Sequence, residues 1–363
     1  MDEDKPNLIL TGISGRLGIR LLPHLKEYAV TGIGLTPPGT SHTVNFVRLD
    51  LGLEESCREL FLLMRTLRPV AVIHLASFTG SSGSRSDDAA RTWQINVAGT
   101  ARVFEALTEV NRDEEIIKKF IFLSCALAYG TRLGGPVSED QKLAAASLSL
   151  AIHKLEADQA VQQRAPSARG CSVYLLRSAV FAGAGISNYF VGAFRGAPPR
   201  DPDSRDVRVM KDGKRLPCIL PWGKKYAQSQ IQFVHVEDVA RVIQFILRKT
   251  DPESKRLTIL NVAGRGEPLA LQTCAEISGT KLLRIPGRWA TRQLMSILQK
   301  IGVSEFPPEA VDYLFDGPII NTGRLRDFLG PYYEDVIRYT ISEAFADSFA
   351  VPSPVKAESP AEA

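Results

Sequence analysis

Three glycines near the amino end of the chain, Gly12, Gly15 and Gly18, have the spacing of a loop that binds a dinucleotide phosphate. They follow an apolar run at residues 8–10, typical of a buried strand, and an apolar helical pattern begins directly after them. The first glycine permits a tight turn, the second lets the backbone approach a pyrophosphate, and the third allows close packing of helix on strand. The alternative is an ordinary glycine-rich turn, but the flanking strand and helix favour a dinucleotide site.

The segments that must position this loop alternate between strand and helix patterns. We expect a helix at residues 16–28, kinked by Pro23, and further helices at 53–67 and 92–109. Strands are expected at residues 29–35, 46–49, 70–75, 120–123, 172–179 and 257–262. Such alternation predicts βαβ units, and therefore an α/β fold with a parallel sheet.

The choice between NAD and NADP stays open in the sequence. A carboxylate that would bind the ribose of NAD is expected at the end of the second strand, but no acidic residue occurs between Glu27 and Asp50. No arginine directly follows that strand to meet the 2′-phosphate of NADP. The nearest cation is Arg16, directly after Gly15.

Composition limits the classes of function. The net charge of +4 over 363 residues gives no electrostatic case for nucleic acid or an anionic membrane as a partner. No apolar run approaches the ~20 residues of a membrane span, and residues 1–6 are unlike a signal peptide. The five cysteines are scattered without metal-ligand spacing, which predicts reduced thiols in a cytoplasmic protein without a bound metal.

The chain resembles the extended short-chain dehydrogenase/reductase family, of the NAD-dependent epimerase/dehydratase type. The matching pieces are residues 11–18, 50–51, 74–76, 96–100, 128–130 and 235–240, together with Lys154 and Arg177. Their order and spacing extend the resemblance to about Phe345. It implies a Rossmann-type doubly wound sheet, a smaller carboxy-terminal α/β substrate domain, and redox chemistry at a nicotinamide.

The resemblance also implies positions for a cofactor and a substrate. The cofactor, NAD or NADP, would be held by Gly12, Ser14, Gly15, Arg16, Leu17, Gly18, Asp50, Leu51, Leu75, Ala76, Ser77, Asn96 and Lys154. Substrate contacts are expected at Tyr129 and Asn188. The catalytic positions are expected at Lys154 and at Cys125, which stands where the family has a Ser or Thr.

The catalytic positions depart from the family pattern. The family's tyrosine, four residues before the lysine, is replaced by Leu150, which transfers no proton. Ser149, His153 and Tyr129 are weak substitutes, and Tyr189 is a further one if an unusual loop brings it to the nicotinamide. The arginine that clamps a phosphate in nucleotide-sugar enzymes is replaced by Ile231, which weakens the case for a nucleotide-sugar substrate.

The domain boundaries follow from the same resemblance. Residues 1–180, with 231–250 returning, are expected to form the cofactor domain, and residues 181–230 and 251–348 the substrate domain. We expect a hairpin near residues 212–213 and a disordered tail at residues 352–363.

Two functions remain open at this point. The first is an NAD(P)-dependent oxidoreductase, epimerase or dehydratase that acts on a small hydroxyl, carbonyl or sugar-type substrate with an altered active site. The second is a cofactor-binding sensor or regulatory protein without turnover. A homodimer is expected through helices at 92–109 and 144–163, the first of which carries Val97, Val103, Phe104 and Leu107.

Overall fold

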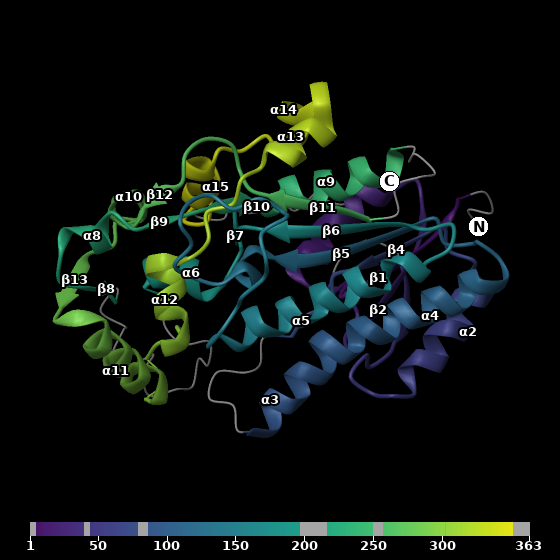
Figure 1. Cartoon of the computed structure of the whole chain (residues 1–363), viewed down its shortest axis with the longest axis horizontal. Coiled ribbons are helices and arrows are strands. Elements are labelled where there is room, and N and C mark those ends of the chain that lie inside the picture. The colour runs from purple at the N-terminus through teal and green to yellow at the C-terminus, as the bar shows by residue number, and fades with distance from the viewer. Residues whose placement is uncertain are drawn as a thin grey trace, which may run out of the picture.

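The computed structural model describes residues 5–39, 44–78, 86–196, 216–249, 257–301 and 303–350. Seven parallel strands form its central sheet, in the order β11-β6-β5-β4-β1-β2-β3 (Figure 1). The strands are β1 (Asn7–Thr11), β2 (Ala29–Gly34), β3 (Asn45–Arg48), β4 (Ala71–His74), β5 (Lys119–Cys125), β6 (Ser172–Ser178) and β11 (Leu257–Val262). The predicted α/β fold of Rossmann type is therefore confirmed. The strand order reverses at β1, so the carboxyl ends of β1, β4 and β5 meet at one edge, where ligands bind in such folds.

Helices cover both faces of this sheet. One face carries α1 (Arg16–Leu21) and α9 (Val236–Arg248), and the other carries α2 (Ser56–Leu67), α4 (Gly99–Asp113) and α5 (Ser149–Arg164). Short helices η1 (Leu22–Leu25), α3 (Ser86–Trp93), η2 (Gln94–Ala98), η3 (Ala126–Tyr129) and η4 (Ala165–Ser167) connect these elements.

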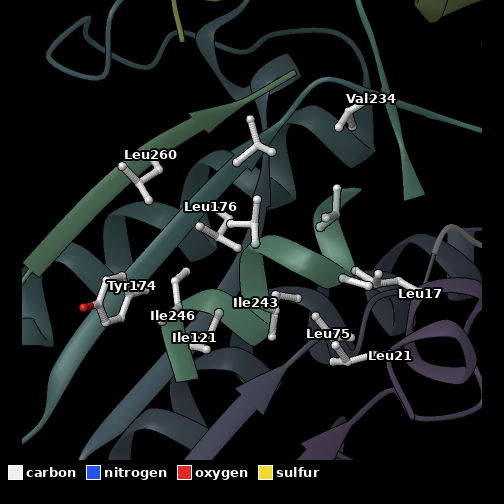
Figure 2. Packing of buried hydrophobic residues seen from close by; sticks show 14 of the residues in the cluster. Leu17, Leu21, Leu75, Ile121, Tyr174, Leu176, Val234, Ile243, Ile246 and Leu260 are labelled. Carbon is white, nitrogen blue, oxygen red and sulfur yellow. The ribbon is translucent and has the colours of Figure 1, made fainter. Parts of the chain in front are cut away.

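Alternation along each strand builds a core on both faces. Leu8 and Leu10 of β1 point to the α1/α9 side, whereas Ile9 packs with α2 and α4. On the α9 side, Ile243 and Ile246 pack with Ile121 and Leu176 of the sheet (Figure 2). Because both faces are covered, these strands are apolar at nearly every position.

The remaining elements lie beyond the carboxyl edge of the sheet or return to it. They are β7 (Val180–Ala182), α6 (Tyr189–Arg195), β8 (Cys218–Pro221), α8 (Lys224–Ala227), β9 (Gln230–Ile231), β10 (Phe233–His235), β12 (Leu269–Ala270), α10 (Leu271–Ser278), β13 (Leu282–Ile285), α11 (Gly287–Lys300), η5 (Pro308–Ala310), α12 (Val311–Asp316), α13 (Gly323–Leu329), η6 (Gly330–Tyr332), α14 (Tyr333–Val336) and α15 (Ile341–Asp347). Three two-stranded sheets pair β7 with β10, β9 with β12, and β8 with β13.

Several expectations need correction. The first helix does not continue to residue 28, because α1 ends at Leu21 and Pro23 lies in the 3₁₀ turn η1. Residues 251–348 do not all belong with the substrate side: β11 pairs with β6, and Leu325 and Leu329 of α13 pack in the core of the central sheet. The expected hairpin and carboxy-terminal tail lie outside the described residues.

The apolar residues expected at a dimer interface are also placed differently. Val103, Phe104 and Leu107 are fully buried in the core of their own chain, and Val97 is 8% exposed. They are therefore not available to a second subunit. Among the described residues, no helix is long and apolar enough to cross a membrane.

Candidate functional site

The glycine loop is shaped by close backbone approaches. Gly12 has φ +72°, and a Cβ there would lie 2.7 Å from the Ala76 nitrogen; a Cβ on Gly18 would lie 2.5 Å from the Ile13 oxygen. Both glycines are therefore required by the fold itself. Gly15 differs, because its Cβ would meet only the Gly12 oxygen at 3.1 Å, and the residue is exposed. The space in front of Gly15 is open for a ligand.

Helix α1 begins at this loop without a side-chain cap. Gly15 is its N-cap, and the first turn carries no acidic residue. A phosphate placed here would meet uncapped N–H groups and the positive end of the helix. The Arg16 side chain is exposed beside it, Ser14 Oγ accepts a 3.5 Å hydrogen bond from Thr36 Oγ1, and Leu17 is buried.

Asp50, expected beside an adenine, is held by two partners. Its Oδ1 accepts from the Gly52 nitrogen at 2.9 Å, and its Oδ2 pairs with Arg91 of α3. The neighbouring Leu51 carbonyl accepts from Arg102 Nη1 at 3.0 Å. Sequence reasoning missed both arginines, because they are distant in the chain and belong to no motif.

A buried hydrogen-bond chain ties the glycine strand to Asn96. The Thr100 hydroxyl donates to the Asn96 carbonyl, so it accepts from Nε2 of His74 at 2.9 Å, and Nδ1 of His74 then accepts from the Thr11 hydroxyl at 2.7 Å. Burial lowers the pKa of His74 to about 3, which keeps the ring neutral.

The Asn96 side chain is committed to the loop after β4. Its Oδ1 and Nδ2 bond the backbone nitrogen and oxygen of Phe78, both at 2.7 Å. It therefore holds the segment that contains Leu75, Ala76 and Ser77. Asn96 lies in the π-helical turn η2, a type of distortion frequent at functional sites.

Cys125 and Lys154 lie together at the carboxyl end of β5. Lys154 Nζ donates to the Leu123 carbonyl at 2.9 Å and lies over the Phe122 ring. Burial lowers the pKa of Lys154 to about 8, against the opposing influence of Cys125 and Asp158. Burial also raises the pKa of the Cys125 thiol, whose sulfur accepts from the Leu127 nitrogen at 3.5 Å, so this thiol is neutral at physiological pH.

The tyrosine position has no titratable group. Leu150 lies in the first turn of α5 and packs against the apolar cluster of the substrate side. Ser149, one residue earlier, is exposed. His153 is buried, its Nδ1 has no partner among the described residues, and burial lowers its pKa.

Tyr129 does not reach a ligand pocket. It is fully buried, its hydroxyl donates to Asn261 Oδ1 at 2.8 Å, and it accepts from Arg177 Nη1 at 2.9 Å. Arg177 in turn forms a buried fork with Asp158, with two N–O distances of 2.9 Å. Both hydrogen bonds of the hydroxyl are thus made inside the protein, which gives Tyr129 a structural role, and the substrate contact expected there stays a prediction.

Asn188 does border a cavity, of about 80 Å³, between α6, β8 and α11. Its Oδ1 caps α6 by accepting from the Phe190 and Val191 nitrogens, and Nδ2 donates to the Phe181 carbonyl. The Tyr189 side chain also lines this cavity. Most other lining groups are apolar, including Cys218, Met295, Phe306, Leu314 and Phe315.

The phosphate-clamp position is buried and apolar. Ile231 of β9 pairs with Leu269 of β12 and is 6% exposed. The nearby motif at residues 235–240 serves the fold, since His235 caps α9 and the fully buried Asp238 accepts from the Arg338 and Tyr339 nitrogens.

A model of the NAD dependent epimerase/dehydratase family matches residues 8–263 of the sequence. The chain belongs to this family. The match includes the glycine loop, Asp50, Cys125 and Lys154, and it confirms the resemblance expected from the motifs. No curated protein matches the sequence of this family member.

Solved structures share the fold of this family member at low identity. WbmH of Bordetella bronchiseptica, in complex with NAD⁺, has a TM-score of 0.65 at 18% identity, over 95% of this chain and 97% of that one. A UDP-glucose 4-epimerase of Thermus thermophilus, in complex with NAD, has a TM-score of 0.64 at 18% identity, over 94% and 97%. MoeE5, in complex with UDP-glucuronic acid and NAD, has a TM-score of 0.62 at 17% identity, over 94% and 97%.

Proposed function

We propose that this chain is an NAD-dependent oxidoreductase of the epimerase/dehydratase type, with a small hydroxyl, carbonyl or sugar-type substrate and an altered active site. One arrangement carries the proposal. An open glycine loop after β1, the Ala76 segment after β4 and the Cys125–Lys154 pair at the end of β5 share one edge of the sheet. That edge is where doubly wound sheets bind dinucleotides.

The residues present fit an NAD molecule. The pyrophosphate would lie against Gly15 and the uncapped start of α1, with Ser14, Arg16 and Leu17 around it, and the adenine beside Asp50 and Leu51. Residues 75–77, held by Asn96, would border the nicotinamide side, and Lys154 would bind its ribose. When bound, the nicotinamide supplies a hydride acceptor or donor. The NAD-bound neighbours support NAD over NADP, and no arginine follows β2.

Proton transfer cannot use the family's tyrosine position, because that position holds Leu150. We propose that the Lys154 ammonium exchanges a proton with the substrate oxygen through a water molecule, since its pKa of about 8 lies near physiological pH. The neutral Cys125 thiol donates a weak hydrogen bond to the same oxygen. Leu150 packs against the apolar cluster of the substrate side and carries no proton.

A second candidate is a sensor that binds NAD without turnover. Leu150 is the observation that favours it, because general acid–base catalysis is worth about 10²–10⁴ in rate and leucine supplies none. The cavity beside Asn188 favours the enzyme, because a sensor needs no substrate pocket.

Calorimetry and turnover separate these candidates. The wild type should bind NAD, and reduced-cofactor absorbance should report turnover with a panel of UDP-glucose, UDP-glucuronic acid and small hydroxy-ketones. Lys154→Ala should lower turnover by about 10²–10⁴, whereas the exposed control Lys142→Ala should not. Tight NAD binding without turnover on any of these substrates would support the sensor, and no NAD binding would refute both.

We further propose a homodimer in the cytoplasm. The five cysteines are free thiols, which suits a reducing compartment. A dimer through α4 and α5 would use their outward residues, since the inward ones are buried. Light scattering at high protein concentration tests the assembly.

A further inference from the structure

Five large apolar side chains are exposed around the start and outer face of α11: Trp222, Leu283, Trp289, Ile297 and Ile301. We call this set the tip surface. Trp289 is 75% exposed and Trp222 is 63% exposed, the two highest values among the large apolar residues that the structure describes. β8, β13, α8 and α11 lie at one end of the long axis, opposite the end formed by α2 and α4 (Figure 1).

The segments that carry the two tryptophans adjoin each other. β8 runs beside β13, with Pro221 in register with Ile285, and Trp222 Nε1 donates to the Arg284 carbonyl at 3.1 Å. Helix α11 starts two residues after Ile285, which places Trp289 in its first turn. The pairing of β8 with β13 thus brings the segments that carry Trp222 and Trp289 to the same end of the molecule.

Helix α11 carries apolar side chains on both its inner and its outer face. Met295 and Leu298 line the internal cavity. At 100° per residue, Trp289, Ile297 and Ile301 span about 120° of the opposite side. A helix that only packed on its own domain would present polar residues there.

The segment that carries most of this surface has charges of one sign only. Residues 281–301 contain Lys281, Arg284, Arg288, Arg292 and Lys300, and no acidic residue. Arg288 and Arg292 are neutralised by Asp316 and Asp312 of α12. The other three are exposed and form no ion pair within the described residues.

One more cation and one carboxylate lie near these exposed cations. Lys224, in α8 beside Trp222, is a fourth exposed cation without an ion pair in the described part of the chain. The carboxylate that shares a shallow hollow with Arg284 is Glu276, which accepts a hydrogen bond from Gln272.

We propose that the tip surface docks on an anionic membrane surface, as a peripheral contact. Exposed tryptophan and isoleucine suit the boundary between headgroups and acyl chains, and surrounding lysine and arginine suit anionic headgroups. A protein partner with an acidic rim is less favoured, because none of the five apolar side chains lines the cavity beside Asn188 or the hollow beside Arg284. The net charge of +4 does not reveal this cluster of cations, because it is a sum over the whole chain.

Sedimentation with vesicles tests the proposal on the full chain. Vesicles of phosphatidylcholine with about a third phosphatidylglycerol should bind the protein, and vesicles of phosphatidylcholine alone should bind it weakly. The variant Lys281→Gln with Arg284→Gln should lower the partition coefficient by about fivefold per charge. The control Lys118→Gln with Lys142→Gln removes two exposed cations elsewhere and should leave it unchanged.

The apolar contribution to vesicle binding is tested by the double variant Trp289→Ser with Ile297→Ser. The matched control is Leu53→Ser with Leu62→Ser, which alters two comparably exposed leucines, one just before α2 and one on it. Only the first pair should reduce vesicle binding, by about tenfold or more. In a Trp93→Phe background both remaining tryptophans report from the tip, and their emission should shift to the blue on anionic vesicles. Calorimetry with NAD checks that each variant is folded.

Three results would overturn the proposal. Equal sedimentation with both kinds of vesicle excludes an anionic surface. Unchanged binding of the tip variants places the contact elsewhere. A dimer in light scattering that Trp289→Ser with Ile297→Ser dissociates, without any vesicle binding, identifies the tip as an interface between two copies of the chain.

Discussion

The cofactor side and the substrate side of the candidate site hold their polar groups in different ways. On the cofactor side, Thr11, His74, Thr100 and Asn96 bond one another in a buried chain, and each heteroatom has a fixed partner. The cavity on the substrate side is lined mainly by carbon, and its cap residue Asn188 contributes the amide. The first side thus fixes its polar groups inside the protein, whereas the second offers mainly apolar surface.

The largest contrast is expected within the glycine loop. Gly18→Val should prevent stable folding, because its Cβ would lie 2.5 Å from a backbone oxygen. Gly15→Val should fold and lose NAD binding by at least about 100-fold, because its side chain would occupy the phosphate position. Circular dichroism and calorimetry measure the two effects. A Gly15→Val protein that binds NAD normally would remove the phosphate site from this loop.

A buried ion pair and a partly exposed one should differ in their contribution to the free energy of unfolding. Asp158→Ala leaves the buried Arg177 without its carboxylate and should cost about 3–5 kcal/mol in the free energy of unfolding. Asp316→Ala, on the substrate side, breaks a pair that is about a quarter exposed and should cost about 1 kcal/mol or less. Urea denaturation of both variants gives the values. Equal losses of unfolding free energy in the two variants would contradict the expected difference between a buried and a partly exposed ion pair.

The pH dependence of stability should single out Lys154. The pKa of Lys154 is about 8 in the folded chain against its ordinary value of 10.5, so the unfolded chain binds more protons between these pH values. Its contribution is therefore complete above pH 10.5 and is lost as the pH falls through about 8. Lys154→Met should be more stable than the wild type at pH 7, by up to ~3 kcal/mol, and the difference should shrink toward pH 10. A difference that does not change with pH would contradict a buried, titrating Lys154.

The smallest effect is expected at the cap of α6. Asn188→Ala removes the acceptor for two backbone N–H groups and should lower the free energy of unfolding by about 1 kcal/mol, whereas Asn188→Asp retains the cap. Thermal unfolding of the two variants makes the comparison. Equal melting temperatures would show that water replaces the cap and that α6 is held by packing alone.

Local sequence patterns predicted the parallel sheet and the glycine loop. The glycine spacing and the βαβ alternation depend on residues that are close in sequence, so both features could be predicted without the structure. Lys154 and Cys125 were found by their place in the family pattern. The roles of Gly12 and Gly18, as positions where any Cβ collides with backbone, needed coordinates.

Long-range partners were not predictable in the same way. Tyr129 was expected at a substrate pocket because the sequence does not reveal its partners Arg177 and Asn261, which lie 48 and 132 positions away. The residues expected at a dimer interface were misplaced for a related reason: an apolar stripe at helical spacing predicts burial, but it does not tell whether the same chain or a second chain buries it. The tip surface was missed because net charge averages over the whole chain.

The contacts that hold His235 and Asp238 have a consequence for folding during synthesis. His235 Nε2 donates to Asp347 and its ring stacks on Tyr339, while Asp238 accepts from the nitrogens of residues 338 and 339. The start of α9, which covers one face of the sheet, is thus completed by residues 100 or more positions later in the chain. A nascent chain cannot form these contacts until residues 338–347 have been made, so a chain cut short before them should depend on chaperones at the start of α9.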